Sequence, residues 1–309
     1  MEFKVLVSDP LAEEAIENMR QAGLTVEVKT ELTPEGLKKE IAGYTAIVVR
    51  SATKLRKEII DAANTLKLIV RAGVGLDNID VDYAKSTGIE VRNTPAASSN
   101  SVAELALGHM LSTARHIGRG TASLKQGKWE KKKLKGVEIN GKTLGIIGIG
   151  RIGRSLAQKA SALGMRVIAN DKFVHKSPLP DIVRMVTPEE LFAESDFISL
   201  HIPFDPAEGA TIGDKEIGLM RDGVRIINCA RGGVIDERAL ADGIRTGKIA
   251  AAAIDVFENE PPDVNHPLFA QEAISLTPHI GAATVEAQGR VGKEAAEIVI
   301  EYAKSSQEA

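Results

Sequence analysis

The chain has 309 residues, of which 43% are hydrophobic and 26% charged, a composition typical of a globular protein with about two domains. Its formal net charge of −3 at pH 7 argues against nucleic acid or an anionic membrane as a partner, and no apolar run approaches the ~20 residues of a membrane span. The single cysteine excludes an intrachain disulfide, and the N-terminal segment reads as a strand rather than a signal peptide, so we expect a cytoplasmic protein without a structural metal.

Short β-rich runs alternate with helical patterns along the whole chain, which predicts α/β architecture with largely parallel sheets. In the first part we expect strands over residues 3–9, 24–30, 45–51, 66–73 and 89–93. Amphipathic helical patterns lie between them, for example over residues 12–23 and 33–43. Residues 98–129 follow as one helical pattern that is too long for a simple crossover.

A second α/β series follows this helical pattern. We expect its strands over residues 143–150, 165–171, 196–203, 224–232, 249–257 and 273–281. A last helix, over residues 284–305, comes after the second sheet is complete and could return to the first. We therefore predict two doubly wound parallel-sheet domains with the active-site cleft between them. Residues 1–94 and 285–309 would form one domain, and residues 95–284 would form the other, inserted into it.

The stretch TLGIIGIGRIGRSL, residues 143–156, has the glycine spacing of a dinucleotide-binding turn. Gly148, Gly150 and Gly153 follow a strand and open a helix, where glycines let the backbone approach a pyrophosphate and the helix N-terminus supplies amide donors. The next strand ends in Asp171, which can bind both ribose hydroxyls of NAD and would repel the 2′-phosphate of NADP. The alternative is a tight turn followed by an ordinary surface aspartate.

Ligands of doubly wound sheets bind beyond the carboxyl ends of the strands, and reactive residues gather there in this sequence. The first sheet would carry Arg50, Ser51 and Arg71 at these ends, followed by Val74 and Gly75. The second would carry Asp171, His201, Cys229, Ala230, Arg231, Asp255 and His279. Two sheets facing each other across a cleft would aim these groups inward, so we predict the site there.

Hydride transfer between an alcohol and a ketone needs a proton carrier, and histidine is the usual one. Four of the six histidines lie elsewhere: His109 and His116 on the long helix, as packing or surface residues, and His175 and His266 in loops. His201 is expected to line a polar pocket. His279 lies at a strand end, before a turn of small residues, and is the better candidate. The alternative is a hydrogen-bonded core histidine.

A catalytic histidine gains from a carboxylate that favours its protonated form, and a substrate anion or carbonyl needs a positive group. The loop DVFENEPP offers Glu258 and Glu260, the latter next to two prolines. Arg231 lies in the short turn ARGG. Its planar guanidinium suits a carboxylate because it donates two parallel hydrogen bonds to it and stays charged. Arg231, Glu260 and His279 come from three strand ends of one sheet, so they can converge.

These residues resemble those of the D-isomer-specific 2-hydroxyacid dehydrogenases, over essentially the whole chain. Seven motifs occur in the family's order: VRSATKL, RAGVGLDNID, NTPAASSNSVAELAL, LGIIGIGRIG, NCARGGVIDE, DVFENEPP and LTPHIGAAT. The resemblance implies a Rossmann NAD-binding domain inserted into a flavodoxin-like substrate domain. It also implies that His279 is the general acid–base with Glu260 as its partner, and that Arg231 binds the α-carboxylate and polarises the 2-oxygen.

The resemblance extends to the binding residues. For the cofactor it implies Gly148, Gly150, Arg151, Ile152 and Gly153 at the pyrophosphate, Asp171 at the adenosine ribose, and Cys229, Ala230 and Asp255 on the nicotinamide side, with His201 and Gly281 as further contacts. For the substrate it implies the backbone of Val74 and Gly75 at the carboxylate, and Arg50, beside Ser51 and with Arg71 or Lys54, at a distal phosphate.

The implied activity is NAD-dependent oxidation of a 2-hydroxy acid. Arg50 and Lys54 favour a phosphorylated substrate, D-3-phosphoglycerate, whose oxidation to 3-phosphohydroxypyruvate is the first step towards serine. The alternative is a reductase of glyoxylate, hydroxypyruvate or another 2-keto acid, which would share every catalytic group. A redox-sensing corepressor of this fold is an interpretation of another class, disfavoured because the chain retains the whole Arg–Glu–His set.

The resemblance also bears on assembly and regulation. The helix after Pro95 resembles the family's dimerisation arm, so a homodimer is expected. The sequence ends at Ala309, directly after the catalytic core, so we expect no C-terminal regulatory domain and no feedback by serine.

Overall fold

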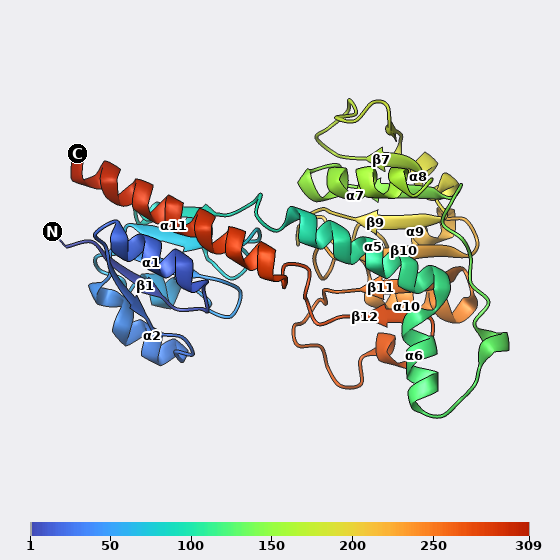
Figure 1. Ribbon diagram of the computed structural model, residues 1–309, viewed down its shortest axis with the longest axis horizontal. Coiled ribbons are helices and arrows are strands. Elements are labelled where there is room, and N and C mark those ends of the chain that lie inside the picture. Colours follow the sequence, from blue (N-terminus) through green and yellow to red (C-terminus); the bar gives the residue numbers. More distant parts are fainter. Residues whose placement is uncertain (1, 309) are drawn as a thin grey trace. The chain divides into compact units, whose positions relative to one another are not determined.

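The computed structural model describes residues 2–308. The chain divides into two compact units, shown in Figure 1: unit 1 comprises Met1–Ser98 and Ala282–Ala309, and unit 2 comprises Ser99–Gly281. Each unit contains one parallel sheet with helices on both faces, which confirms the predicted fold class of two doubly wound α/β layers. Among the described residues, no helix is long and apolar enough to cross a membrane.

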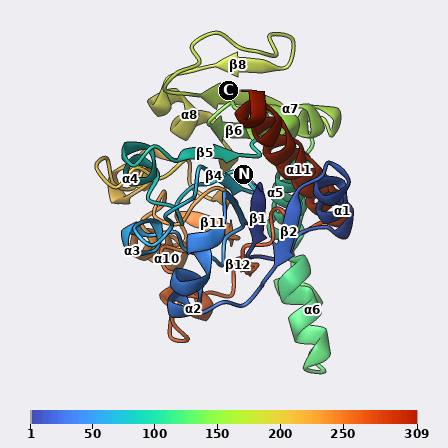
Figure 2. The same cartoon turned by 90° about the vertical axis from the view of Figure 1, so that its left-hand side faces the viewer.

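Unit 1 contains a five-stranded sheet in the order β2-β1-β3-β4-β5. Its strands are β1 (Lys4–Val7), β2 (Thr25–Val28), β3 (Ala46–Val49), β4 (Leu68–Arg71) and β5 (Glu90–Asn93). Its helices are α1 (Glu13–Gln21), α2 (Pro34–Glu40), η1 (Ile41–Gly43), α3 (Lys57–Ile60), α4 (Val81–Ser86) and α11 (Val285–Glu308). Figure 2, which faces this unit, shows α1 and α11 on one side of the sheet and α2, α3 and α4 on the other.

The central strands of unit 1 are buried on both faces, as their continuous apolar sequences predict. Successive side chains of a strand point to opposite faces. Val5 and Val7 of β1 therefore lie in one core, together with Met19 of α1 and Val299 of α11. Leu6, between them, lies in a second core that includes residues of α2, α3 and α4.

Unit 2 contains a seven-stranded sheet in the order β12-β11-β10-β9-β6-β7-β8. Its strands are β6 (Thr143–Ile147), β7 (Arg166–Asn170), β8 (Val183–Met185), β9 (Phe197–Leu200), β10 (Val224–Asn228), β11 (Ile249–Ile254) and β12 (Ile274–Leu276). Its helices are α5 (Ser99–Arg115), α6 (Ile117–Lys125), η2 (Lys131–Lys133), α7 (Arg151–Ala162), α8 (Pro188–Glu194), α9 (Asp214–Leu219), α10 (Glu237–Thr246) and η3 (Pro267–Ala270).

Two helical layers also enclose the sheet of unit 2. Ile146 of β6 lies in a core with residues of α5 and α7, which run side by side in Figure 1. Ile147, the next residue, lies in the opposite core with residues of α8, α9 and α10. All the strand pairs of this sheet are parallel, so their carboxyl ends meet at one edge.

The structure differs from the expectation for unit 2 in two places. It has a seventh strand, β8, which is only three residues long and carries an exposed Arg184, so it lacks the apolar run that marks the others.

The long helical pattern over residues 98–129 is two helices, α5 and α6, because His116 between them adopts a left-handed conformation with φ of 55°. Gly118 and Gly120, which have low helix propensity, follow directly.

Candidate active site

The predicted residues of unit 2 lie at the carboxyl edge of its sheet. They follow the strand ends in this order: Gly148 after β6, with Arg151 and Ile152 opening α7; Asp171 after β7; His201 after β9; Cys229, Ala230 and Arg231 after β10; Asp255 after β11; and His279 after β12. The topology therefore brings together groups that are up to 131 residues apart, counted from Gly148 to His279 (279 − 148).

Three glycines shape the turn between β6 and α7. Gly148 has a φ of 94°, and a Cβ there would lie 2.6 Å from the carbonyl oxygen of His201. A Cβ on Gly153 would lie 2.2 Å from the carbonyl oxygen of Gly148, so the first turn of α7 packs directly against the loop. Around Gly150, by contrast, the described residues leave the Cβ position open. The N–H groups that begin α7 thus adjoin an open space, an arrangement suited to a pyrophosphate.

Asp171 ties the glycine turn to the end of β7. Its Oδ2 accepts a hydrogen bond from the backbone N–H of Ile149 (2.8 Å). Its Oδ1 accepts from the N–H groups of Phe173 (2.9 Å) and Val174 (3.1 Å). Asp171 also lines a cavity of about 660 Å³ that extends to the start of α8. The carboxylate is therefore held in place beside a space large enough for part of a nucleotide.

The loop after β12 is held by the buried carboxylate of Asp255, which is 1% exposed. Oδ1 accepts hydrogen bonds from the hydroxyl of Thr277 (2.6 Å) and the N–H of Ile280 (2.9 Å), and Oδ2 accepts from the N–H of Gly281 (2.9 Å). The backbone N–H of His279 donates to the carbonyl oxygen of Asp255 (2.7 Å). These bonds hold His279 at a φ of 53°, a left-handed conformation that few non-glycine residues adopt.

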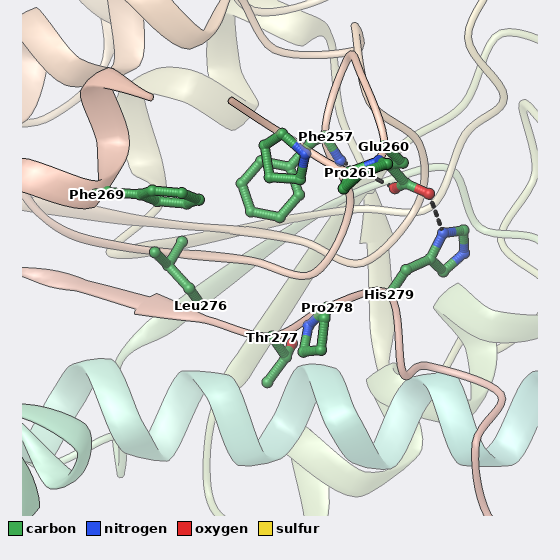
Figure 3. A pocket seen from close by; sticks show the side chains of 9 residues that line it. Phe257, Glu260, Pro261, Phe269, Leu276, Thr277, Pro278 and His279 are labelled. Atoms are coloured by element: carbon green, nitrogen blue, oxygen red, sulfur yellow. Dashed lines mark hydrogen bonds and ion pairs between the residues drawn. The ribbon is translucent and has the colours of Figure 1, made fainter. Parts of the chain in front are cut away.

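The side chains of His279 and Glu260 form a pair, drawn in Figure 3. Nδ1 of His279 lies 2.7 Å from Oε2 of Glu260, and Oε1 of Glu260 accepts a hydrogen bond from the N–H of Phe257 (3.1 Å). Burial raises the pKa of Glu260, but the His279 ring, the Phe257 N–H and the positive charge of Arg231 together bring it below 4.5. Glu260 is therefore a carboxylate at neutral pH.

The turn that carries Arg231 packs against the loop that carries Glu260. A Cβ on Gly232 would lie 1.9 Å from the carbonyl oxygen of Phe257, so the two backbones touch at this glycine. The Asn228 side chain, at the end of β10, donates to the carbonyl oxygen of Arg231 (2.9 Å) and fixes the turn. The structure thus brings a guanidinium, a carboxylate and an imidazole into one region of unit 2.

A cavity of about 420 Å³ adjoins the pair, with apolar walls that include Phe257, Phe269 and Leu276. Figure 3 shows Glu260 and His279 together at one end of this cavity. The side chains of His279 and Glu260 are 43% and 37% exposed, so both remain accessible to a ligand.

Cys229 is buried and His201 is half-buried, and both are poor candidates for proton transfer. Burial lowers the pKa of His201 to about 4, and its Nε2 lies 2.9 Å from the hydroxyl of Ser199. Burial also raises the pKa of the Cys229 thiol, which the charge of Asp255 raises further. Both groups are thus neutral at pH 7. No set of three or more His, Cys, Asp or Glu residues among positions 2–308 is arranged to hold a metal ion.

The predicted substrate-binding residues lie in unit 1. The segment after β3 is fixed from two sides: the backbone N–H groups of Arg50 and Thr53 donate to the carboxylate of Asp9, and the amide of Asn78 donates to the carbonyl oxygens of the same two residues (both 2.7 Å). The guanidinium of Arg50 lies 3.4 Å from the carbonyl oxygen of Pro10. The exposed side chains of this segment include Ser51 and Lys54.

The loop after β4 contains the other predicted substrate residues. Gly73 has a φ of 151°, and a Cβ there would lie 1.4 Å from a guanidinium nitrogen of Arg71, so this side chain covers the glycine backbone. Val74 and Gly75 follow and are half-buried, and the carbonyl oxygen of Val74 accepts a hydrogen bond from the amide of Asn93.

A family model described as "D-isomer specific 2-hydroxyacid dehydrogenase, NAD binding domain" matches residues 107–281, more than half of the chain. The chain belongs to this family. It is 50% identical to the hydroxypyruvate reductase of Thermotoga maritima over 297 residues, which are 96% of both chains. It is 48% identical to the D-3-phosphoglycerate dehydrogenase of Archaeoglobus fulgidus over 98% of its own length, and it spans 58% of that relative.

Solved structures of 2-hydroxyacid dehydrogenases share the fold. The D-lactate dehydrogenase of Aquifex aeolicus, complexed with NAD and lactic acid, aligns with a TM-score of 0.86 at 31% identity, over 99% of this chain and 96% of the other. A glyoxylate reductase from Paecilomyes thermophila aligns with a TM-score of 0.87 at 33% identity, over 99% of this chain and 95% of the other.

The glycine turn fits the NAD-binding domain of the 2-hydroxyacid dehydrogenases. Its first glycine has the backbone conformation of a tight turn, its second leaves room for a ligand, and its third lets α7 approach the loop. Asp171 lies at the end of the adjacent strand, where this class of domain binds the adenosine ribose. The cofactor predicted from the sequence, NAD, therefore agrees with both the family and the geometry.

Four residues that organise the site were not among the predicted ones: Asp9, Asn78, Asn228 and Thr277. A signal existed for Asn228, since an asparagine at a strand end often bonds to backbone groups two or three residues ahead. For Asp9, Asn78 and Thr277 the partners are distant in the sequence, by 22 to 44 residues, and only the fold reveals them.

Proposed function

We propose that this chain is an NAD-dependent D-2-hydroxyacid dehydrogenase that oxidises D-3-phosphoglycerate to 3-phosphohydroxypyruvate, the first step towards serine. The observation that carries the proposal is the hydrogen bond of 2.7 Å between Nδ1 of His279 and Oε2 of Glu260, next to the turn of Arg231. Relatives of about 48% identity that are named D-3-phosphoglycerate dehydrogenase support the choice of substrate.

In the proposed reaction, His279 takes up the proton of the substrate hydroxyl at Nε2. Its Nδ1–H donates to Glu260, which orients the ring and stabilises the imidazolium that forms. Arg231 binds the substrate carboxylate and draws electron density from the 2-oxygen. Bound NAD supplies the acceptor for the hydride that leaves C2. In the reverse direction His279 returns the proton to the 2-oxygen, and the same groups reduce a 2-keto acid.

The binding residues predicted from the sequence keep their proposed roles. For NAD these are Gly148, Gly150, Arg151, Ile152, Gly153, Asp171, His201, Cys229, Ala230, Asp255 and Gly281. For the substrate they are Arg50, Ser51, Lys54, Arg71, Val74 and Gly75. The fixed backbone of the Arg50 segment supports a role in recognising a phosphate, because a held loop needs no ordering on binding.

Formation of NADH by the purified chain tests this proposal, with NAD and either D-3-phosphoglycerate, D-glycerate or D-lactate as substrate. A preference for the phosphorylated acid of at least about ten-fold in kcat/KM would support it. Turnover of the unphosphorylated acids alone would retain the chemistry but reject the substrate. Absence of turnover with every 2-hydroxy and 2-keto acid would reject the function itself.

The second candidate is a hydroxypyruvate or glyoxylate reductase. The Thermotoga relative named hydroxypyruvate reductase, at 50% identity over 96% of both chains, favours it. The two candidates share every proposed catalytic group, so only the recognition of a distal phosphate separates them. Faster reduction of hydroxypyruvate or glyoxylate by NADH than of 3-phosphohydroxypyruvate would select the reductase.

We also propose a homodimer through the helices after Pro95. Ile117 and Leu124 of α6 are 55% and 58% exposed, and Trp129, just beyond this helix, is 81% exposed. Three large, exposed apolar side chains within 13 residues suggest that a partner covers them. Light scattering of the purified chain should give the mass of a dimer. A Leu124→Glu variant should give the mass of a monomer.

A further inference from the structure

A row of buried polar side chains connects helix α5 to the loop that carries His279. On α5, His109 is 4% exposed, and both of its ring nitrogens have partners on the neighbouring strand and loop. Nε2 lies 2.9 Å from the hydroxyl of Thr277, and Nδ1 lies 3.2 Å from the hydroxyl of Ser275. The hydroxyl of Ser112, one turn further along α5, lies 3.3 Å from that of Ser275. The row ends at Asp255, to which Thr277 donates.

The direction of each hydrogen bond in this row follows from its last member. The Asp255 carboxylate only accepts, so the Thr277 hydroxyl donates its single proton there. Thr277 must then accept from His109, which requires a proton on Nε2. Burial lowers the pKa of His109, although the charge of Asp255 acts in the opposite sense. The ring is therefore neutral. With its proton on Nε2, its Nδ1 accepts a hydrogen bond from the hydroxyl of Ser275. Every polar atom of the row is satisfied in this one arrangement.

We propose that His109 is a positioning residue for the proposed dehydrogenase reaction: through Thr277 it fixes the Asp255 carboxylate, and with it the loop that carries His279. The inference rests on the proposed function for its effect on turnover. The contact itself is independent of that function, because it concerns the conformation of the loop.

The loop needs such support because its conformation is unusual. His279 has a φ of 53°, in the left-handed region that few residues other than glycine adopt. The bonds from Thr277, Ile280 and Gly281 to the Asp255 side chain hold the loop in this state. Figure 3 shows Thr277 pointing away from Glu260, so His109 supports the loop from the side opposite the catalytic pair.

Two substitutions of His109 separate hydrogen bonding from packing. In His109→Gln, the side-chain amide reaches as far as Nε2 and can still donate to Thr277. In His109→Leu, an apolar side chain fills the space without a donor. We expect His109→Leu to lower kcat by about ten-fold or more, since a small displacement of a catalytic group has effects of this size. We expect His109→Gln to restore most of kcat.

Met110→Ala is the matched control, because Met110 is the next residue of α5, fully buried, and belongs to the apolar core. It should lower the melting temperature and leave kcat unchanged. The proposal fails if His109→Leu lowers only the melting temperature, as Met110→Ala does. It also fails if His109→Gln and His109→Leu lower kcat equally, since the donor would then be irrelevant.

A second measurement does not depend on activity. In the chain with ¹⁵N-labelled histidine, NMR correlations between ring nitrogens and ring protons report which nitrogen is protonated. His109, assigned by the loss of its signals in His109→Gln, should carry its proton on Nε2 near neutral pH, and His109→Leu should shift the ring signals of His279. A proton on Nδ1, or unshifted His279 signals, would overturn the inference even if the dehydrogenase activity were confirmed. If the activity were absent but both NMR results were found, the positioning inference would stand and the proposed function would fall.

Discussion

Nδ1 of His279 lies 2.7 Å from Oε2 of Glu260, and the other oxygen of the same carboxylate accepts the N–H of Phe257. A backbone N–H of its own loop therefore fixes the Glu260 carboxylate, and this carboxylate in turn orients the ring of His279. A carboxylate only accepts hydrogen bonds, so Nδ1 of His279 carries a proton and Nε2 is left to exchange one with a substrate. This relationship is the structural basis of the proposed proton transfer.

The first prediction concerns that carboxylate. Glu260→Gln should lower kcat by about a hundred-fold or more, because an amide can turn its NH₂ group towards His279 and favour the wrong tautomer. The dissociation constant of NAD, measured by calorimetry, should be unchanged. Glu258→Gln removes an exposed carboxylate from the same loop and should have little effect on kcat. Equal losses in both variants would contradict the role of Glu260.

The second prediction is the pH dependence of that contact. The folded-state pKa of Glu260 lies below 4.5, so its carboxylate binds fewer protons in the folded chain than in the unfolded one. Its contribution to stability is therefore present above pH 4.5 and is lost as the pH falls through the folded-state value. The difference in melting temperature between the unaltered chain and Glu260→Gln should disappear over this acidic range. A difference in melting temperature that grows as the pH is lowered would contradict this prediction.

The third prediction concerns His201, whose pKa burial lowers to about 4. Between pH 6.5 and about 4 the unfolded chain takes up a proton that the folded chain does not, so stability should fall as the pH is lowered across this range. Replacing the ring in His201→Gln should make the melting temperature depend less on pH there. His175→Gln removes an exposed histidine and serves as the control. Equal slopes for all three chains would contradict the prediction.

The fold class was predictable because each central strand is a continuous apolar run followed by a turn and an amphipathic helix. The position of the site residues was predictable because parallel strands place their carboxyl ends at one edge of the sheet. Strand β8 was missed because three residues with one exposed arginine show no periodicity. The break at His116 was missed because a single left-handed residue interrupts an otherwise continuous helical pattern.

The contacts that orient the site were less accessible to sequence analysis. The sequence predicts Glu260 as a partner of His279 from its place in the loop DVFENEPP and from the resemblance, but the contact of 2.7 Å is set by the folded loops after β11 and β12. The bonds that Asp255 makes to Thr277 depend on the pairing of β11 with β12. His109 was interpreted as a packing or surface residue because nothing local marks its partners, which lie 166 and 168 residues away.

The fourth prediction uses two glycines of the turn before α7. In Gly153→Ala the new Cβ would lie 2.2 Å from the Gly148 carbonyl oxygen, so the melting temperature should fall sharply. In Gly150→Ala the methyl group has space and a favourable φ of −69°, so the melting temperature without NAD should be unchanged. The same methyl group should weaken NAD binding by about ten-fold or more, because it occupies the space proposed for the pyrophosphate. Unaltered NAD binding by Gly150→Ala would contradict this position for the cofactor.

The fifth prediction concerns the phosphate. Arg50→Ala should raise the KM for D-3-phosphoglycerate by about ten-fold or more, since a charged hydrogen bond to a phosphate contributes about 1.5–3 kcal/mol. Turnover of D-glycerate should be unaffected. Lys85→Ala removes the same charge from an exposed position of α4 and should change neither value. Equal effects of Arg50→Ala on both substrates would remove the argument for a phosphorylated substrate.

The most direct test of the central claim follows the hydrogen on C2 of the substrate. D-3-phosphoglycerate deuterated at C2 is incubated with NAD and the purified chain, and the mass of the NADH formed is measured. The account predicts NADH that carries the deuterium, and none from a His279→Asn chain, whose asparagine tolerates the left-handed conformation at this position. NADH without deuterium, or deuterated NADH formed at an undiminished rate by His279→Asn, would contradict it.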